Sequence, residues 1–231
     1  IGILQVLEEN NLPLDQVVGT SMGAVVAGLY SLGYTPGEIE GIAKGIDWNN
    51  LFSDAPHRRN LFLAQKEMSN QELVSIRFKG FQPYLPDALF KGERLFLKIL
   101  QLVVSSPFGI QCGDYDSLSV PIGIVTTDLL SGQRVLIREG DMAIAIRASL
   151  SVPIIFRPLR YNGKLLVDGG AIENIPVLAT RETGADIVIA VDCSSPKVPA
   201  INPDDPWEIA NQVTTMMTVA QDSISRNAAD L

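Results

Sequence analysis

Histidine and cysteine are both scarce in this chain. Its 231 residues include one histidine, His57, and two cysteines, Cys112 and Cys193, which lie far apart in the sequence. Neither cysteine belongs to a C-x-x-C motif or has a histidine nearby, so two buried thiols are a simpler interpretation than a metal site or a redox pair. We therefore expect no metal and no cofactor.

Basic residues are also few. The 18 lysines and arginines are outnumbered by 26 acidic residues, which gives a net charge of −8 and a pI near 4.7. Nucleic acid binding requires clustered positive charge, so nucleic acid is not an expected partner. Docking on an anionic membrane by charge alone is disfavoured as well, although insertion of apolar side chains stays open. No apolar run approaches the ~18 residues that a membrane-spanning helix needs.

Helical and strand patterns alternate along a chain that is 46% hydrophobic and 19% charged. One α/β domain over residues 1–231 is the natural interpretation. Two hairpin signals, between residues 120–127 and 134–137 and around Asn162-Gly163, predict a mixed rather than a purely parallel sheet. The other expected elements are helices at 1–9, 24–30, 35–44, 93–104, 141–148, after 174 and at 207–231, and strands at 17–18, 165–168 and 186–191.

Both ends of the chain lack helix boundary signals. Residues 1–9 form the body of an amphipathic helix with no start signal, and residues 207–231 form a helical pattern with no final cap. We expect the domain to be truncated at both ends. Localisation and fusion to further domains stay open, because no export signal can be judged from this sequence.

An irregular insert rich in aromatic residues is expected at residues 51–108. Seven of the eight phenylalanines fall within it. Such an insert beside a hydrolase core could form an acyl-chain channel, or a lid that contacts the membrane surface. Packing of the rings into a subdomain core is the alternative, and the two are compatible.

The segment Gly19-Thr20-Ser21-Met22-Gly23 fits a nucleophile elbow. It lies between a β-branched run and a helical run, and a Gly-x-Ser-x-Gly turn in that position presents a strained serine. Gly19 and Gly23 would then be required because side chains there would crowd the turn. The N-terminus of the helix points N–H groups at the serine, so the backbone N–H of Met22 is a candidate oxyanion donor. An ordinary βα turn is the alternative.

A serine hydroxyl needs a base, and the sequence offers two candidates. His57 lies in a polar, proline-broken segment beside two arginines, whose charges disfavour imidazolium, and it precedes rather than follows the candidate acid, so a triad is disfavoured. Asp168 ends an apolar strand and is followed by Gly169 and Gly170, which allow another backbone to approach. A simple strand-to-turn aspartate is the alternative. As a base, Asp168 would need partial desolvation to raise its pKa.

Several motifs occur together in order. They are the Gly-Thr-Ser-Met-Gly-Ala elbow, Thr127-Asp128-Leu129 with Ser131-Gly132, the segment Ala148–Pro153, and the Asp-Gly-Gly turn. Over residues 1 to about 193 they resemble the bacterial branch of the patatin-like phospholipase family. The resemblance implies a three-layer α/β/α fold with a mixed central sheet. It also implies a Ser–Asp dyad, with Ser21 as the nucleophile and Asp168 as the base, that hydrolyses lipid acyl esters through an acyl-enzyme without a metal.

The chain departs from the family at one point. Family members carry a Gly-Gly-Gly-x-Arg/Lys-Gly loop before the first helix, whose N–H groups form the oxyanion hole, and this loop is absent here. We expect it upstream in the full protein, with a degenerate family member as the alternative, and its absence leaves the activity of this fragment open.

The predicted function is a lipid acyl hydrolase of the phospholipase A type, acting on phospholipid or another fatty-acyl ester. A general serine esterase or thioesterase on the same scaffold is one alternative. A non-catalytic domain that holds an anion at the helix N-terminus is another. The elbow has no phosphate-binding lysine, however, and Asp168 would repel an anion if it lay close.

Overall fold

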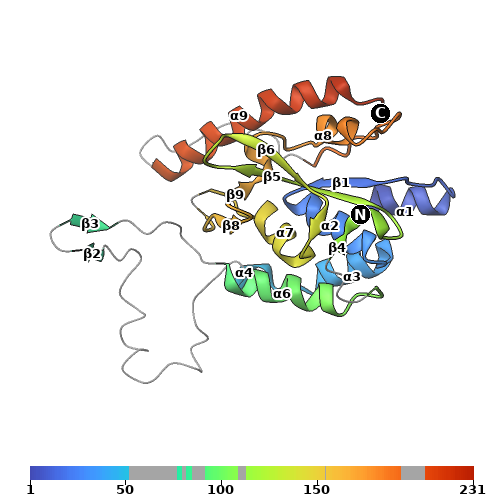
Figure 1. The fold of residues 1–231 in the computed structure, drawn as a ribbon, viewed down its shortest axis with the longest axis horizontal. Coiled ribbons are helices and arrows are strands. Elements are labelled where there is room, and N and C mark those ends of the chain that lie inside the picture. The colour runs from blue at the N-terminus through green and yellow to red at the C-terminus, as the bar shows by residue number, and fades with distance from the viewer. Residues whose placement is uncertain (52–76, 80–81, 85–91, 109–112, 154, 194–205) are drawn as a thin grey trace.

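The computed structural model describes residues 1–51, 77–79, 82–84, 92–108, 113–153, 155–193 and 206–231 (Figure 1). Its helices are α1 (Gly2–Glu9), α2 (Met22–Ser31), α3 (Pro36–Gly45), α4 (Trp48–Leu51), α6 (Glu93–Val104), α7 (Met142–Ser149), α8 (Val177–Glu182) and α9 (Pro206–Ala228), with 3-10 turns η2 (Tyr115–Ser117) and η3 (Gly169–Ala171). Its strands are β1 (Val17–Thr20), β2 (Arg77–Lys79), β3 (Gln82–Tyr84), β4 (Gly113–Asp114), β5 (Ile122–Asp128), β6 (Gln133–Ile137), β7 (Glu139–Gly140), β8 (Leu159–Tyr161) and β9 (Lys164–Asp168).

The main sheet is mixed, as the sequence predicts. Its strands run in the order β1-β5-β9-β8, and β6 also pairs with β5. The β1–β5 pair is parallel, whereas β5 pairs antiparallel with β6 and β9, and β8 pairs antiparallel with β9. All seven residues of β5 are buried, as expected of a central strand covered on both faces.

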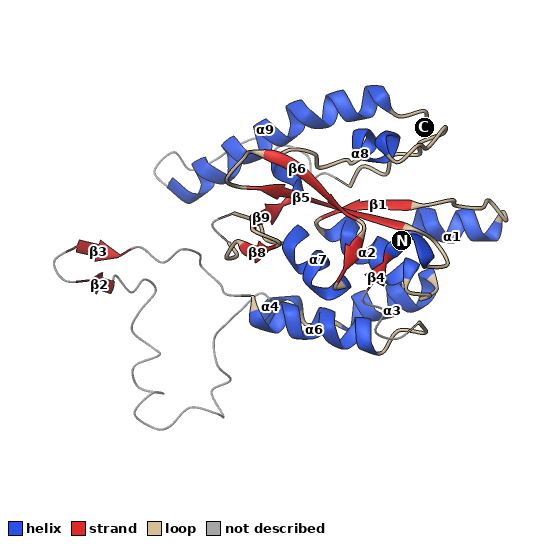
Figure 2. Ribbon diagram, viewed as in Figure 1, coloured by secondary structure: helices blue, strands red, loops and turns tan. Residues whose placement is uncertain are grey.

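Helices cover both faces of this sheet. Figures 1 and 2 show α8 and α9 on one side, and α2 and α7 on the other with α6 packed beyond α7. The chain therefore has the three-layer α/β/α arrangement that the sequence predicts. The main hydrophobic core lies between the sheet and the α2, α6 and α7 layer, and its residues include Ala24, Leu95, Ile124, Ile146 and Leu166.

Local sequence signals set several element boundaries. Thr35 forms a capping box with Glu38 at the start of α3, with Pro36 at the first helical position. The apolar stripe of residues 93–104 forms α6 over the predicted range. Asn162 and Gly163 adopt φ values of 48° and 77°, the positive values that a type I′ turn requires between β8 and β9.

Two expectations at the C-terminal end of the core are wrong. Residues 186–191 are not a strand of the described sheet, and Ile187 and Ile189 are 72% and 42% exposed. The backbone of Val188 instead accepts hydrogen bonds from Asp230 and Leu231. Val188 is the one buried residue of this segment, so the apolar composition overstated its burial. Cys193 follows it and is exposed rather than buried.

The expected insert at residues 51–108 lies largely outside the described residues. The described parts are Leu51, the short β2–β3 hairpin and residues 92–108, which contain α6. The described residues therefore do not include His57, Cys112 or most of the phenylalanines of the insert. The division into a single domain with an insert stays a prediction.

Candidate active site

Ser21 occupies the turn between β1 and α2. Its backbone has φ 53° and ψ −122°, a region that residues with a side chain seldom adopt, at a cost of about 1–3 kcal/mol. A Cβ on Gly19 would lie 2.5 Å from the carbonyl oxygen of Gly23 and 2.6 Å from the Cα of Ala24. The turn is therefore sharp and strained, and it is closed only because residue 19 has no side chain.

Gly23 does not share this constraint. Apart from its own helix, no atom of the described residues lies within 4 Å of the position that a Cβ on Gly23 would occupy. The expected crowding at both elbow glycines holds at Gly19 alone, because Gly23 already lies on the open first turn of α2. Met22 is 43% exposed beside it, and backbone N–H groups of a first helical turn have no acceptor within the helix.

Ser149, the last residue of α7, holds the strained turn in place. Its buried Oγ accepts a 2.8 Å hydrogen bond from the backbone N–H of Ser21 and donates one of 2.7 Å to the carbonyl oxygen of Val125. The sequence identified the segment Ala148–Pro153 as a motif but did not predict this contact. The hydroxyl therefore connects α7, β5 and the elbow. It is also the hydrogen-bond acceptor for the N–H of Ser21.

Ser149→Ala is expected to lower the free energy of unfolding by about 1–3 kcal/mol, because it leaves two backbone groups without their partner in a buried place. The measurement is the midpoint of urea unfolding, compared with that of the wild type. Ser117→Ala is the matched control, since its exposed Oγ only donates to the carbonyl oxygen of Asp114. This variant should stay within about 0.5 kcal/mol of the wild type. Equal effects of the two substitutions would contradict the role given to Ser149.

Asp168 is the last residue of β9 and is almost fully buried. It pairs with Thr126 of β5, and its backbone N–H donates a 2.9 Å hydrogen bond to the carbonyl oxygen of Ser151. Its carboxylate oxygen Oδ1 accepts a 2.7 Å hydrogen bond from the N–H of Gly170. The side chain is thus fixed by the sheet on one side and by the turn that follows it on the other.

Ser21 and Asp168 meet at this point, although 147 residues separate them in the chain. Their side chains lie close enough for the Ser21 hydroxyl to act on the Asp168 carboxyl. Burial raises the pKa of the Asp168 carboxyl above its ordinary value of 3.8, and the interactions with the Ser21 hydroxyl and with the N–H of Gly170 offset only part of this rise. The pair consists of a strained, partly exposed serine hydroxyl and a desolvated carboxylate that can accept its proton.

The two glycines after Asp168 allow the turn to pack closely. A Cβ on Gly169 would lie 2.4 Å from the carbonyl oxygen of Val125, so the backbone of β5 leaves no room for a side chain there. A Cβ on Gly170 would lie 3.1 Å from Oδ1 of Asp168 and 3.3 Å from Oδ1 of Asn174. Gly169 therefore permits the contact with β5, and Gly170 brings its N–H to the carboxylate.

Asn174 and Asp222 form a second support that sequence analysis missed. The Nδ2 group of Asn174 donates hydrogen bonds of 3.2 Å to both carboxylate oxygens of Asp222, which is fully buried on α9. This contact ties α9 to the turn after Asp168. The two residues are 48 positions apart, so no local pattern predicts their meeting.

Asp128, in another of the motifs, has a structural role. Its carboxylate accepts hydrogen bonds from the hydroxyl of Ser131 at 2.7 Å and from the N–H of Leu165 at 3.1 Å. It therefore closes the β5–β6 hairpin and joins it to β9, the strand that ends at Asp168.

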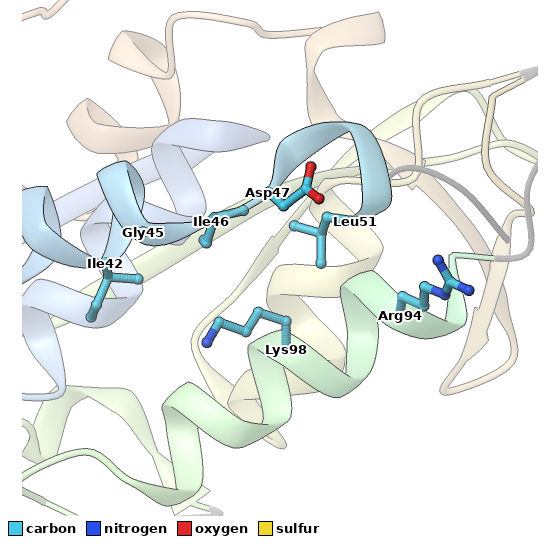
Figure 3. Close-up of a pocket in the computed structure, with 7 residues that line it drawn as sticks. All are labelled: Ile42, Gly45, Ile46, Asp47, Leu51, Arg94 and Lys98. Carbon is cyan, nitrogen blue, oxygen red and sulfur yellow. The ribbon is translucent and has the colours of Figure 1, made fainter. Parts of the chain in front are cut away.

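The described part of the chain also contains two cavities. One, of about 410 Å³, lies between α3, α4 and α6, and Figure 3 shows Asp47, Arg94 and Lys98 among its lining residues. The other, of about 390 Å³, lies between the start of α6, α7 and β8. Neither is lined by Ser21 or Asp168. No helix in the described part of the chain is long and apolar enough to span a bilayer.

Comparison with known proteins gives a family match over most of the chain. The family model for patatin-like phospholipases matches residues 1–181. An NTE family protein of Mycobacterium tuberculosis is 29% identical over 191 residues, which are 83% of this chain and 44% of the relative. Lysophospholipase NTE1 of the yeast Meyerozyma guilliermondii is 29% identical over 195 residues, which are 84% of this chain and 12% of the relative.

A similar relative is found in another bacterium. The protein YqhO of Bacillus subtilis is 29% identical over 192 residues, which are 76% of this chain and 60% of the relative. The chain thus spans less than two thirds of the length of these relatives.

Proposed function

Because the chain belongs to the patatin-like phospholipase family, we propose that it is a lipid acyl hydrolase of the phospholipase A type. Ser21 is the nucleophile and Asp168 is the general base. The observation that carries this proposal is the proximity of the strained Ser21 to the buried carboxylate of Asp168, whose pKa is raised by burial. A base whose pKa lies closer to neutrality takes a proton from a hydroxyl more effectively than an ordinary aspartate does.

The reaction proceeds in two steps. Ser21 Oγ attacks the ester carbonyl carbon as Asp168 accepts its proton, and the tetrahedral intermediate then expels the alcohol, which takes up that proton. An acyl-enzyme remains. Asp168 next accepts a proton from water, the hydroxide attacks the acyl carbon, and Ser21 leaves with its proton restored. The fatty acid is the second product.

The oxyanion of each intermediate needs donors. The N–H of Ser21 is occupied by Ser149, whereas the N–H of Met22 belongs to the open first turn of α2. Met22 is therefore the oxyanion donor that we assign within this chain. The partial positive charge of the helix N-terminus supports the same site.

The proposed substrate is a phospholipid or another fatty-acyl ester. Relatives of this chain include a lysophospholipase, and the chain spans only 12% of that protein. Peripheral contact with a membrane and fusion to further domains are consistent with these comparisons and stay predictions. Most of the aromatic residues expected to make that contact lie outside the described residues.

A fluorophosphonate probe tests this function directly. Applied to the folded full-length protein, it should form a covalent adduct on Ser21, located by mass spectrometry of the peptide. The same protein, thermally unfolded before addition of the probe, is the control and should not react, because activation depends on Asp168 lying beside the hydroxyl. A folded protein that stays unlabelled would favour the non-catalytic anion-binding domain. A labelled protein that cleaves short-chain esters but no phospholipid would favour a general esterase.

A further inference from the structure

The 390 Å³ cavity between α6, α7 and β8 concentrates positive charge. Three arginines, Arg147, Arg157 and Arg160, line it, against one acidic residue, Glu93. The whole chain carries a net charge of −8, so this cluster has the opposite sign to the net charge of the protein. Arginine is the side chain best suited to bind phosphate, because its planar guanidinium donates two parallel hydrogen bonds.

Arg147 is fixed in the wall of the cavity. It is 4% exposed, its Nη1 donates a 2.7 Å hydrogen bond to the hydroxyl of Ser151, and its guanidinium lies 5.0 Å from the ring centre of Phe156. A Cβ on Gly92 would lie 2.5 Å from its Nη2, so the N-cap of α6 leaves room for this group only because it is glycine. The guanidinium thus has a constant position, and its charge acts through a poorly solvated wall.

The other two arginines are placed to contact a ligand. Arg157 and Arg160 are exposed and lie on the segment that leads into and forms β8. Apolar and aromatic side chains, among them Phe96 and Tyr161, line the rest of the cavity. A cationic rim above apolar walls suits an anionic amphiphile better than a free inorganic ion.

The strand register places one end of the cavity, at Arg157, toward the end of β9 where Asp168 lies, while Arg160 pairs with Leu165 farther along β9. Leu159 of β8 pairs with Leu166 of β9 in an antiparallel ladder. Arg157 comes two residues before Leu159, and Asp168 comes two residues after Leu166. Both therefore extend in the same direction from this pair, by about 7 Å along each chain. Figure 1 shows α7 between β9 and α6, so the cavity and the Ser21–Asp168 pair border the same helix.

We propose that this cavity binds the phosphate group of a glycerophospholipid or lysophospholipid while the acyl ester lies at Ser21. This inference rests on the proposed function, and it adds the residues that hold the phosphate. In such a lipid only the glycerol unit separates the phosphate from the ester. Arg157 and Arg160 hold the phosphate, and Arg147 contributes fixed positive charge behind them.

Two substrates that differ only in the phosphate provide the test. They are octanoyl lysophosphatidic acid and monooctanoylglycerol, assayed with the full-length protein below their micellar concentrations. The double variant Arg157→Gln/Arg160→Gln should lower the ratio of kcat/KM for the phosphate substrate to that for the neutral one by about 10- to 100-fold, as expected for the loss of charge-assisted hydrogen bonds. The control Lys164→Gln removes an exposed charge opposite Tyr161 but outside the cavity lining, and should change the ratio less than about twofold.

An unchanged ratio in the double variant, or an equal change in the control, would overturn the proposal. Calorimetric binding of the same two lipids and of inorganic phosphate separates this proposal from the hydrolase function. If the wild type hydrolyses neither lipid, the proposed function fails. Tighter binding of the phosphate lipid that is lost in the double variant would still establish the phosphate site. Inorganic phosphate that binds as tightly as the phosphate lipid would overturn the lipid as occupant.

Discussion

Asp168→Asn in the full-length protein is expected to lower kcat by about 10⁴-fold, the scale seen when the acidic partner of a catalytic pair becomes an amide. An asparagine keeps the shape of the side chain and can still accept the hydrogen bond from the N–H of Gly170. It cannot take the proton of Ser21. Steady-state turnover of a phospholipid measures the loss, and circular dichroism checks that the fold is retained.

The same substitution is expected to stabilise the fold at neutral pH. Burial raises the pKa of Asp168 above 3.8, so the folded state binds the proton more tightly than the unfolded state does. Stability is therefore lost as the pH rises from 3.8 through the raised value, and the full cost of the buried carboxylate is present above it. Asp168→Asn removes that cost. Its Tm should exceed that of the wild type at pH 7, and the difference should shrink as the pH falls toward 3.8.

A variant that is inactive but less stable than the wild type at pH 7 would show that Asp168 supports the fold rather than the reaction. Asp128→Asn is the matched comparison, because Asp128 is also a buried carboxylate at the end of a strand, but it accepts hydrogen bonds from Ser131 and Leu165 that hold the hairpin. That variant should lose stability. Opposite signs for the two aspartates are the expected outcome.

Ser21→Ala is expected to reduce turnover to the uncatalysed background, a loss of at least about 10⁴-fold, because it removes the hydroxyl proposed to form the acyl-enzyme. Ser21→Gly should be equally inactive. The two variants differ in stability. Residue 21 has φ 53°, which glycine adopts freely and alanine does not, so Ser21→Gly should be at least as stable as Ser21→Ala despite the extra flexibility of its unfolded chain.

Thermal unfolding of the two variants at one pH gives this comparison. Residual turnover of a few per cent in either variant would mean that another nucleophile, or water activated by Asp168, carries the reaction. A Ser21→Gly variant clearly less stable than Ser21→Ala would mean that the elbow is not strained at this residue.

The sequence predicted those features that depend on a few neighbouring residues. The capping box at Thr35, the Asn162-Gly163 turn and the bounds of α6 all follow from short-range backbone preferences and from the helical period of apolar side chains. The mixed sheet followed from recognising hairpins. The positions of Ser21 and Asp168 at the ends of two strands were likewise visible, since each strand is an apolar run followed by a glycine-containing turn.

The contacts that support the site could not be predicted in this way. Ser149 meets the backbone of Ser21 across 128 positions, and Asp222 meets Asn174 across 48. Serine and aspartate are common residues whose roles depend on what the fold places beside them. Arg147 is similar, because an arginine in a run of small apolar residues gives no sign that it lies against Phe156 and Gly92.

Burial was the property most easily misjudged. The segment 186–191 is as apolar as a core strand, yet its outward residues are exposed, and Cys193 is exposed after it. Apolar composition does not distinguish one covered face from two. At Gly23 the expected crowding failed for a related reason, since a sharp turn has an inner side, where Gly19 lies, and an outer side that is open.

The central claim is that an aspartate, rather than a histidine, activates Ser21. The most direct test compares kcat/KM for Asp168→Asn and for His57→Ala in the full-length protein, with folding of both verified. We expect a loss of about 10⁴-fold for the aspartate variant and a change of less than about threefold for the histidine variant. A folded His57→Ala protein that has lost its activity, beside an Asp168→Asn protein that keeps it, would contradict the account.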